Sequence, residues 1–281
     1  AAAILRLWEQ QRLVLDSSIS KYIAAEHADI IQKKGYALER ISTRQLLAHT
    51  SGLFDYADSG EFFDAVGANP QYHWTRTEQL QLAMECGEPY GTPGEVFRYS
   101  DTGYILLGEI IERISGQSLG LALRGLLHYE QLGLHSTWLE ITEPAPANLP
   151  PRVHQYEGNI DVYDLNGTFD IYGGGGLIST VGDMARFFRG LFEGKVFSSP
   201  DTLTQMLAPV PAKCGGPDYG IWKQVPGTYR LGIDAGENNA VYSHRGHFGT
   251  LAAYVPEIDL AVGLNVGIAQ SGQEDHRLSL L

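Results

Sequence analysis

Tyr99 and Asp101 place a phenol and a carboxylate two residues apart in the stretch FRYSDTGY. Side chains two apart in an extended turn point the same way, so both groups are expected to face one cleft. A phenol has an ordinary pKa of about 10 and serves as a base only where cations stabilise its anion. The pair therefore predicts a catalytic site if a lysine or similar cation lies nearby. The alternative is a tyrosine packed at a helix start, with Asp101 as the N-cap.

A second candidate group lies in YSHRGHFGT, between two expected strands, and contains His244, Gly246 and His247. A glycine at a strand edge lets a substrate backbone approach closely and leaves N–H groups free, which can form half of an oxyanion hole. His244 is expected to donate a hydrogen bond to a substrate carboxylate or carbonyl. Histidines three apart suit a helix rather than a strand turn, and no third ligand is evident, so no metal site is expected. A turn histidine without a role is the alternative.

Three further patterns favour simpler interpretations. Ser18 and Lys21 form a literal S-x-x-K, the spacing of a nucleophilic serine and its lysine. Such a serine must open a buried helix, whereas this polar stretch follows one, so Ser18 is not expected to be catalytic. His49, in LLAHTSGL, is interpreted as a structural histidine. The GGGG at 173–176 lacks the lysine and the preceding strand of a phosphate-binding loop, so tight packing or loop mobility is expected there.

The elements that position these residues are mostly helical in the first two thirds of the chain, where apolar residues repeat with helical spacing between caps and glycines. The expected helices cover 1–14, 16–22, 41–52, 75–87, 101–116, 119–129 and 180–194. Residues 26–40 are predicted to be a polar connector, 54–74 an irregular aromatic-rich segment, and the proline-rich 140–170 an extended surface loop.

After about residue 217 the pattern changes to short apolar runs separated by turns. The expected strands cover 219–225, 228–233, 240–244, 250–256 and 260–266. They predict a β-meander of adjacent antiparallel strands. The fold class is therefore α+β, an antiparallel sheet flanked by helices plus a mainly helical domain. We expect residues 1–205 to form the mainly helical part and residues 206–281 the sheet part.

Composition narrows the classes of partner. The 281 residues are 43% hydrophobic, and the formal net charge is −13. This charge disfavours binding to nucleic acid and to anionic membranes, both of which need a basic surface. No apolar run approaches the roughly 18–20 residues that cross a bilayer, and no signal peptide is expected within these residues. The two cysteines, Cys86 and Cys214, are expected to be unpaired.

The sequence begins at Ala1, without Met, in a segment that is already helical and has no residue before it to cap the helix. We therefore expect that the natural N-terminus is missing and that localisation signals are missing with it. The compartment stays open between the cytoplasm and export.

In this order, the segments resemble the serine β-lactamase-like family, which includes class C β-lactamases, D-alanyl-D-alanine carboxypeptidases, D-aminopeptidases and related esterases. ISTRQLLAHTSGL is similar to the HTSGL signature of the family, and FRYSDTGY is similar to its Y-[SA]-N segment. GGGGLISTVGDMARFF is similar to GGLVSTAEDLARF, and SHRGHFGT stands where K-T-G or H-x-G belongs. The resemblance covers nearly the whole chain. It implies a β-lactamase/transpeptidase-like fold and a serine hydrolase that works through an acyl-enzyme without metal or cofactor.

The resemblance also implies roles for single residues. LVLDSSISKYI looks like the family's LDLDDPVSKYLP, which follows the helix that S-x-x-K opens, so the catalytic serine and lysine would precede Ala1. That lysine and Tyr99 would move the proton of the serine, and Asp101 would orient the lysine side. His244 would bind substrate or assist Tyr99. The N–H of His247, with that of the serine, would hold the oxyanion.

Two departures from the family pattern bear on the substrate. Asp101 stands where Asn is usual, and an ionised carboxylate only accepts hydrogen bonds and repels an anionic ligand. His244 stands where many members of the family have a lysine, which suits the carboxylate of penicillins. A histidine at this place is similar to the esterases and D-aminopeptidases of the family. The expected substrate is a small ester, amide or D-amino-acid peptide, and a β-lactam substrate stays open but is less favoured by these two departures. The alternatives are a catalytically inactive, penicillin-binding-protein-like binding module and an unrelated α+β protein with chance motifs.

Overall fold

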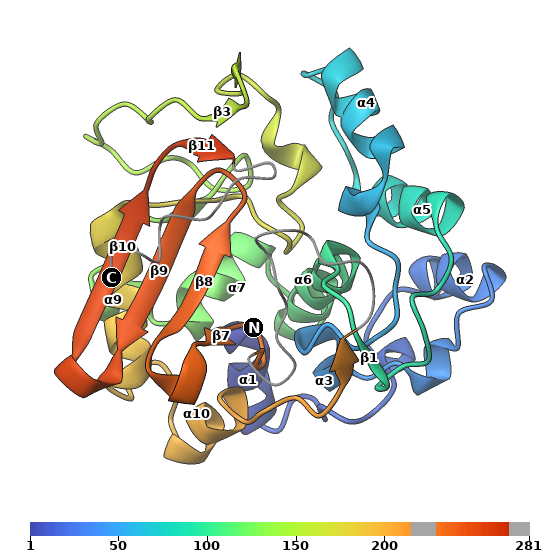
Figure 1. Cartoon of the computed structure of the whole chain (residues 1–281), viewed down its shortest axis with the longest axis horizontal. Coiled ribbons are helices and arrows are strands. Elements are labelled where there is room, and N and C mark those ends of the chain that lie inside the picture. Colours follow the sequence, from blue (N-terminus) through green and yellow to red (C-terminus); the bar gives the residue numbers. More distant parts are fainter. Residues whose placement is uncertain (215–228, 270–281) are drawn as a thin grey trace.

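The computed structural model describes residues 1–214 and 229–269. Figure 1 shows an antiparallel sheet on one side of the molecule and a group of helices on the other, with the N-terminal helix between them. The predicted α+β class is confirmed. None of the helices in the two described ranges is long and apolar enough to cross a membrane.

The main sheet has the strand order β10-β9-β8-β7, and each neighbouring pair is antiparallel. These strands are β7 Asp234–Ala235, β8 Tyr242–Gly246, β9 Thr250–Val255 and β10 Leu260–Asn265. Strands consecutive in sequence are neighbours in space, which confirms the predicted meander. Helix α9, Val181–Phe192, covers β9 and β10. The Phe192 ring stacks on that of Tyr254 with the centroids 4.3 Å apart.

One predicted strand is wrong. Residues 228–233 alternate apolar side chains, and Tyr229, Leu231 and Ile233 are indeed buried. Gly232 is in the left-handed region (φ +75°), and the Arg230 N–H donates to the Ile233 carbonyl at 2.8 Å. The segment is therefore a buried turn that makes one bridge, from Tyr229 to Asp234. The strand predicted at 219–225 lies outside the described residues.

The helices and the shorter strands complete the fold. The helices are α1 Ala2–Glu9, α2 Ala25–Lys33, α3 Thr43–Leu47, α4 Gly60–Ala68, α5 Arg76–Cys86, α6 Asp101–Ser115, α7 Leu119–Leu126, α8 Tyr129–Leu132 and α10 Pro200–Met206. The short strands are β1 Val96–Phe97, β2 Trp138–Leu139, β3 Tyr156–Glu157, β4 Ile160–Asp161, β5 Leu177–Ile178, β6 Lys213–Cys214 and β11 Ile268–Ala269. Capping boxes start α3 and α5, and Gly116 ends α6 in the left-handed region (φ +71°).

Several N-terminal predictions are corrected. The first helix ends at Glu9, because Gln11 adopts a left-handed backbone (φ +59°) that turns the chain. The helix expected at 16–22 is a single 3-10 turn, capped by Ser18. The predicted connector 26–40 contains α2, which buries His27 and Ile31 on one face.

Two loop predictions are also too simple. Helix α4 occupies part of the segment predicted to be irregular at 54–74, and Ser59 caps it. The extended loop at 140–170 does contain two short paired strands, β3 and β4. The Cys86 thiol is free, as predicted.

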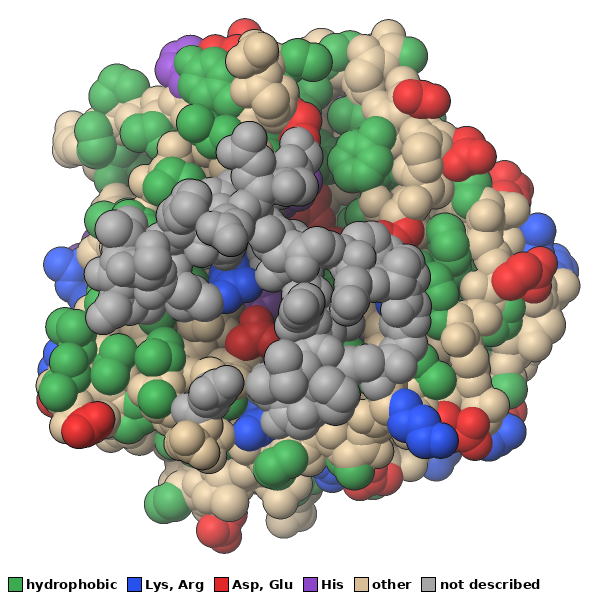
Figure 2. Space-filling model, viewed as in Figure 1, with side chains coloured by type: hydrophobic (Ala, Val, Ile, Leu, Met, Phe, Trp, Pro, Cys, Tyr) green, Lys and Arg blue, Asp and Glu red, His purple; other side chains and the backbone are tan. Residues whose placement is uncertain are grey.

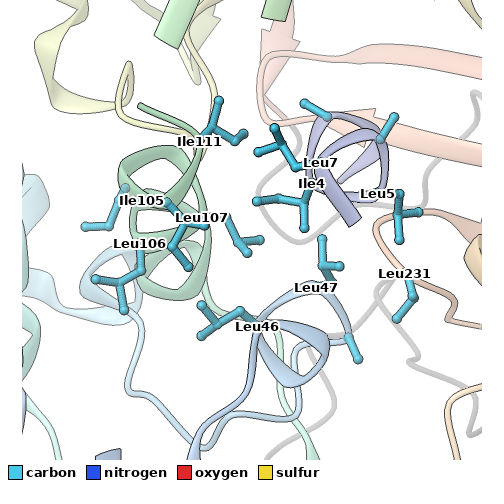
Figure 3. Close-up of a cluster of buried hydrophobic side chains, with 14 of the residues drawn as sticks. Ile4, Leu5, Leu7, Leu46, Leu47, Ile105, Leu106, Leu107, Ile111 and Leu231 are labelled. Carbon is cyan, nitrogen blue, oxygen red and sulfur yellow. The ribbon is translucent and has the colours of Figure 1, made fainter. Parts of the chain in front are cut away.

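The core gathers around α1. Its side chains Ile4, Leu5 and Leu7 are fully buried, and Figure 3 shows Ile4 and Leu7 on the side of α6 and Leu5 beside Leu231. A helix that is apolar around most of its circumference belongs in the middle of a protein. The first residue of α1 therefore lies inside the molecule.

The division into 1–205 and 206–281 remains a prediction. Helix α9 from the first range packs on the sheet of the second, and α10 packs on α1. The central helices thus contact both parts.

Candidate active site

The HTSGL and FRYSD segments meet at a cluster of rings. His49 is 2% exposed and stacks on Tyr99 with the ring centroids 4.0 Å apart. The Tyr104 ring, from the first turn of α6, stacks on His49 at 4.8 Å, and Tyr229 contacts it edge-on at 5.0 Å. Three segments far apart in sequence therefore converge on one buried imidazole.

Asp101 is the first residue of α6, and Ser100 holds the N-cap position. The alternative role of Asp101 as N-cap is therefore wrong. Burial and the carboxylate of Asp170 raise the pKa of Asp101 to about 7, although a hydrogen bond from Tyr99 opposes this. Tyr99 and Asp101 thus lie close together, and the expectation that both face one cleft remains a prediction.

Two further carboxylates lie beside Asp101. Burial and Asp101 raise the pKa of Asp55 well above its ordinary value, although its Oδ1 accepts from the Ala57 N–H at 3.1 Å. Burial raises the pKa of Asp170 to about 7, and the Tyr56 hydroxyl donates to its Oδ1 at 3.4 Å. We call Asp55, Asp101 and Asp170 the acidic cluster. Such a concentration of like charge is characteristic of functional sites.

The GGGG segment closes around this cluster. A Cβ atom on Gly174 would lie 2.5 Å from Asp170 Oδ1, and one on Gly175 would overlap the same carboxylate. A Cβ on Gly173 would overlap the Tyr104 carbonyl oxygen. Of the two predicted roles, the structure therefore shows tight packing against Asp170 and α6.

Tyr99 is a neutral phenol in these surroundings. Burial and the charge of Asp101 raise its pKa well above the ordinary value. A phenolate forms here only if a cation enters and offsets these carboxylates. This is the condition under which the sequence predicted a base at Tyr99.

His244 approaches the same rings from the sheet. It lies half-buried in β8, and the neighbouring Ser243 pairs with Asp234 of β7. Burial lowers the pKa of His244, while the charge of Asp234 opposes the shift. A charge on His244 also lowers the pKa of His49, after burial, so the two imidazoles are neighbours. Tyr99 and His244 therefore both lie near His49.

The start of α1 enters this cluster. A Cβ atom on Gly232 would overlap the Ala1 side chain and lie 2.8 Å from the Tyr104 hydroxyl. The N-terminal end of α1 therefore points at the site.

Gly246 and His247 lie at the tip of the β8–β9 hairpin. The Gly249 N–H donates to the Gly246 carbonyl at 3.2 Å, so His247 occupies the second position of a β-turn. The N–H at that position is not used in closing the turn. The His247 side chain is directed elsewhere, since its Nε2 lies 2.7 Å from Glu157 Oε2 of β3.

Ser18 is remote from these partners. Its hydroxyl donates to the Leu38 carbonyl at 3.2 Å and lies 2.9 Å from the Ser20 hydroxyl. It caps a 3-10 turn, and Lys21 is exposed. This agrees with the interpretation of Ser18 as non-catalytic.

Sequence reasoning missed four members of the site. Asp55, Asp170, Tyr104 and Tyr229 were not singled out, and His49 was interpreted as structural. Only Asp170 had a local signal, because the run of four glycines begins three residues after it. The other three enter the site through tertiary contacts.

Figure 2 shows acidic, basic and histidine side chains near the middle of this face of the molecule. Within the described ranges, no three His, Cys, Asp or Glu side chains are arranged to hold a metal ion.

Known proteins share this fold. The chain is 25% identical to a D-stereospecific amidohydrolase from Streptomyces sp., with a TM-score of 0.79, over 97% of this chain and 80% of that one. A D-amino acid amidase from Ochrobactrum anthropi SV3 gives a TM-score of 0.72 at 21% identity, over 97% and 76%. The hydrolase EstCE1 gives 0.65 at 21% identity, over 98% and 78%.

Curated relatives match at the sequence level. Penicillin-binding protein 4* of Bacillus subtilis (strain 168) is 30% identical over 207 residues, 66% of this chain and 43% of that protein. Protein flp of Staphylococcus aureus (strain COL) is 33% identical over 116 residues, 41% of this chain and 21% of that protein. The chain thus spans less than half the length of these curated relatives.

The fold is the expected β-lactamase/transpeptidase-like one, and the structural relatives include amidases and an esterase-like hydrolase. A family model described as Beta-lactamase matches residues 1–279, nearly the whole sequence. The chain belongs to the beta-lactamase family.

Proposed function

We propose that the protein is a serine hydrolase that works through an acyl-enzyme, with its attacking serine and the accompanying lysine before Ala1. The observation that carries the proposal is the convergence of Tyr99 and His244 on His49, beside the N-terminal end of α1. A serine one or two turns upstream would stand at a helix N-terminus, where backbone N–H groups help to stabilise an oxyanion.

The acidic cluster supports a lysine at this place. Asp101 has a pKa raised to about 7, and the pKa of Tyr99 is also raised. An ammonium group beside them would lower both values, because it favours the charged form of each acid. Tyr99 could then take the proton of the serine with the lysine, while Asp101 holds the lysine side.

The sheet side would bind the acyl group. The His247 N–H, in the turn after β8, is the proposed second donor to the oxyanion. At Gly246 the space of the absent Cβ atom is taken by the Thr250 hydroxyl of β9. His244 would donate to the substrate or assist Tyr99. Burial lowers the pKa of His244 even with Asp234 beside it, and a neutral imidazole still has one N–H group to donate.

For the substrate we propose an ester or amide of a D-amino acid. The acidic cluster of Asp101, Asp55 and Asp170 would repel a substrate carboxylate and attract a substrate ammonium group. The likeness to a D-stereospecific amidohydrolase supports the same class. Penicillins, which carry a carboxylate, are expected to react poorly.

The test uses protein that includes the residues preceding Ala1. A fluorophosphonate probe should label one serine upstream of α1, and the protein should hydrolyse p-nitrophenyl acetate. D-phenylalanine amide should be cleaved faster than its L-enantiomer. Tyr99→Phe should reduce kcat by about 100-fold or more, the scale of a lost general base. Tyr129→Phe, a buried tyrosine of α8, is the matched control and should change kcat little.

If the probe labels no serine and the protein hydrolyses none of these substrates, the proposal is refuted. Saturable binding of a penicillin without turnover or labelling would then favour the non-catalytic binding module.

A further inference from the structure

We propose that His49 is a positioning residue that holds Tyr99 in its reactive orientation. This inference rests on the proposed function, because it assigns His49 a task that acts through Tyr99. The geometry behind it is independent of any catalytic role.

His49 accepts hydrogen bonds from the residues on both sides of Tyr99. Its carbonyl accepts from the Arg98 N–H at 2.8 Å, and its Nδ1 accepts from the Ser100 N–H at 3.0 Å. Its ring stacks on that of Tyr99, with the centroids 4.0 Å apart and the planes at 26°. One residue thus fixes the backbone before and after Tyr99 and one face of its phenol.

An unusual backbone makes these hydrogen bonds possible. His49 is in the left-handed region (φ +51°), which costs a residue with a Cβ atom about 1 kcal/mol or more. This turn after α3 directs the carbonyl and the imidazole of one residue toward the same segment. A side chain held in a costly conformation has a local purpose more often than one in a helix.

The turn that follows continues the same attachment. The Gly94 N–H donates to the Thr50 carbonyl at 2.7 Å, and the Tyr90 N–H donates to the Gly52 carbonyl at 2.9 Å. The HTSGL segment is therefore a backbone template for residues 90–100. His49 is the member of that template that reaches Tyr99.

The imidazole suits the task because it stays neutral. Burial lowers the pKa of His49 well below its ordinary value. A backbone N–H can only donate, so Nδ1 must be the unprotonated nitrogen and Nε2 carries the hydrogen. That Nε2 atom is buried without a hydrogen-bond partner among the described residues. A solely structural histidine would ordinarily use both nitrogens.

The experiment is a double-mutant cycle between His49 and Tyr99 in the protein with its upstream residues. His49→Ala should lower kcat by about 10- to 100-fold, the scale of a misplaced catalytic group, with KM nearly unchanged. His49→Asn keeps an acceptor near the Nδ1 position and should recover part of the loss. In a Tyr99→Phe background, His49→Ala should have little further effect, because its target is gone.

The outcomes separate the two proposals. If Tyr99→Phe leaves kcat intact, the proposed function fails. If Tyr99→Phe abolishes turnover but His49→Ala costs the same factor with and without the Tyr99 hydroxyl, the positioning role is overturned. Activity is expressed per fluorophosphonate-titrated serine, so that partial unfolding does not imitate an effect on kcat. Should His49→Ala not fold, the same cycle with His49→Asn decides.

Discussion

Two of the three acidic residues of helix α6 have opposite environments, Asp101 in its first turn and Glu109 two turns later. Glu109 is buried, yet it accepts from His27 Nδ1 at 2.8 Å and from the Ala24 N–H at 2.7 Å. Burial alone would raise the pKa of Glu109, but these donors bring it below its ordinary value. The pKa of Asp101 is instead raised to about 7, by burial and by Asp170.

Under the proposed function, the difference separates a structural carboxylate, Glu109, from a functional one, Asp101. Glu109 ties α2 to α6, and its charge is satisfied within the fold. Burial and the neighbouring Asp170 disfavour the ionised form of Asp101, so its charge does not stabilise the fold. A cation bound beside Asp101 would favour that charge. Buried groups whose pKa is shifted toward the neutral form are concentrated at active sites for this reason.

The two environments also respond to pH with opposite signs. Glu109 has a lowered pKa in the folded protein, so it stabilises the fold above its unfolded pKa, and that contribution is lost as the pH falls. Asp101 and Asp170 have raised pKa values of about 7, so their contribution is greatest below pH 3.8 and is lost as the pH rises toward 7.

The largest effect is expected from Glu109→Ala. The change leaves the buried His27 imidazole and the Ala24 N–H without their acceptor. Removing one partner of a buried pair costs about 3–5 kcal/mol of unfolding free energy, measurable by urea denaturation. Glu109→Gln keeps an acceptor oxygen and should cost less. A loss below about 1 kcal/mol for the alanine variant would show that this pair does not stabilise the fold.

A smaller loss is expected from Gly108→Ala, one residue before Glu109. A Cβ atom there would overlap the Tyr172 carbonyl oxygen, where the segment that carries Asp170 packs on α6. Overpacking of this kind costs about 1–3 kcal/mol. Gly67→Ala in α4 is the matched control, because no atom lies within 4 Å of its added Cβ.

The control should have the opposite sign. Alanine is favoured over glycine in a helix by about 1 kcal/mol, so Gly67→Ala should raise the melting temperature. Stabilisation of both variants would contradict the close contact between Gly108 of α6 and the Tyr172 carbonyl, just before the GGGG segment.

Asp170→Asn tests the acidic cluster in the opposite direction. The amide keeps an acceptor for the Tyr56 hydroxyl and removes a charge that is unfavourable when ionised. At pH 8 the variant should be more stable than the parent by about 1–2 kcal/mol, and the gain should shrink at pH 5, where the parent carboxyls are protonated. Denaturant unfolding at the two pH values measures both quantities.

The matched control is Asp161→Asn in the surface loop, where donors from Tyr163 and His154 lower the pKa of the carboxyl. Replacing it should give no gain at either pH. An equal gain for the two variants would mean that net charge, and not the acidic cluster, governs the response.

The parts of the fold predicted from sequence are those whose signals are local. Thr75 with Glu78 starts α5, and Gly116 ends α6, each within one turn of the helix it delimits. Helix α2 was missed because its buried face has two residues, one of them His27, whose burial depends on Glu109 far along the chain. The strand at 228–233 was wrong because alternation alone does not reveal a turn at Gly232.

The candidate site divides in the same way. Tyr99 and Asp101 could be predicted as a pair because two residues of spacing set their geometry, and the structure brings them together. Asp55 and Asp170 could not, because the contacts that bring them to Asp101 join three separate loops. The task of His49 depends on a left-handed backbone that the letters HTSGL do not reveal.

The smallest loss of stability is expected at a second His–Glu pair, which is exposed. Comparing it with the buried His27–Glu109 pair tests whether burial causes the larger loss expected there. His247 Nε2 lies 2.7 Å from Glu157 Oε2, close to the 2.8 Å between His27 and Glu109. The side chains of the hairpin pair are 58% and 40% exposed, against 9% and 5% for the α2–α6 pair. Water already solvates both partners of the exposed pair, so little is lost when one is removed.

His247→Ala should therefore change the unfolding free energy by about 0.5 kcal/mol or less, and added salt should erase even that difference. His27→Ala, the same substitution at the buried pair, should cost about 3 kcal/mol or more and keep its effect in salt. Urea denaturation with and without 0.5 M NaCl measures all four values. Similar losses for the two variants would mean that the distance between the partners, and not their burial, sets the unfolding free energy that a His–Glu pair contributes. The opposite pKa shifts of Glu109 and Asp101 would then need a cause other than burial and neighbouring charge.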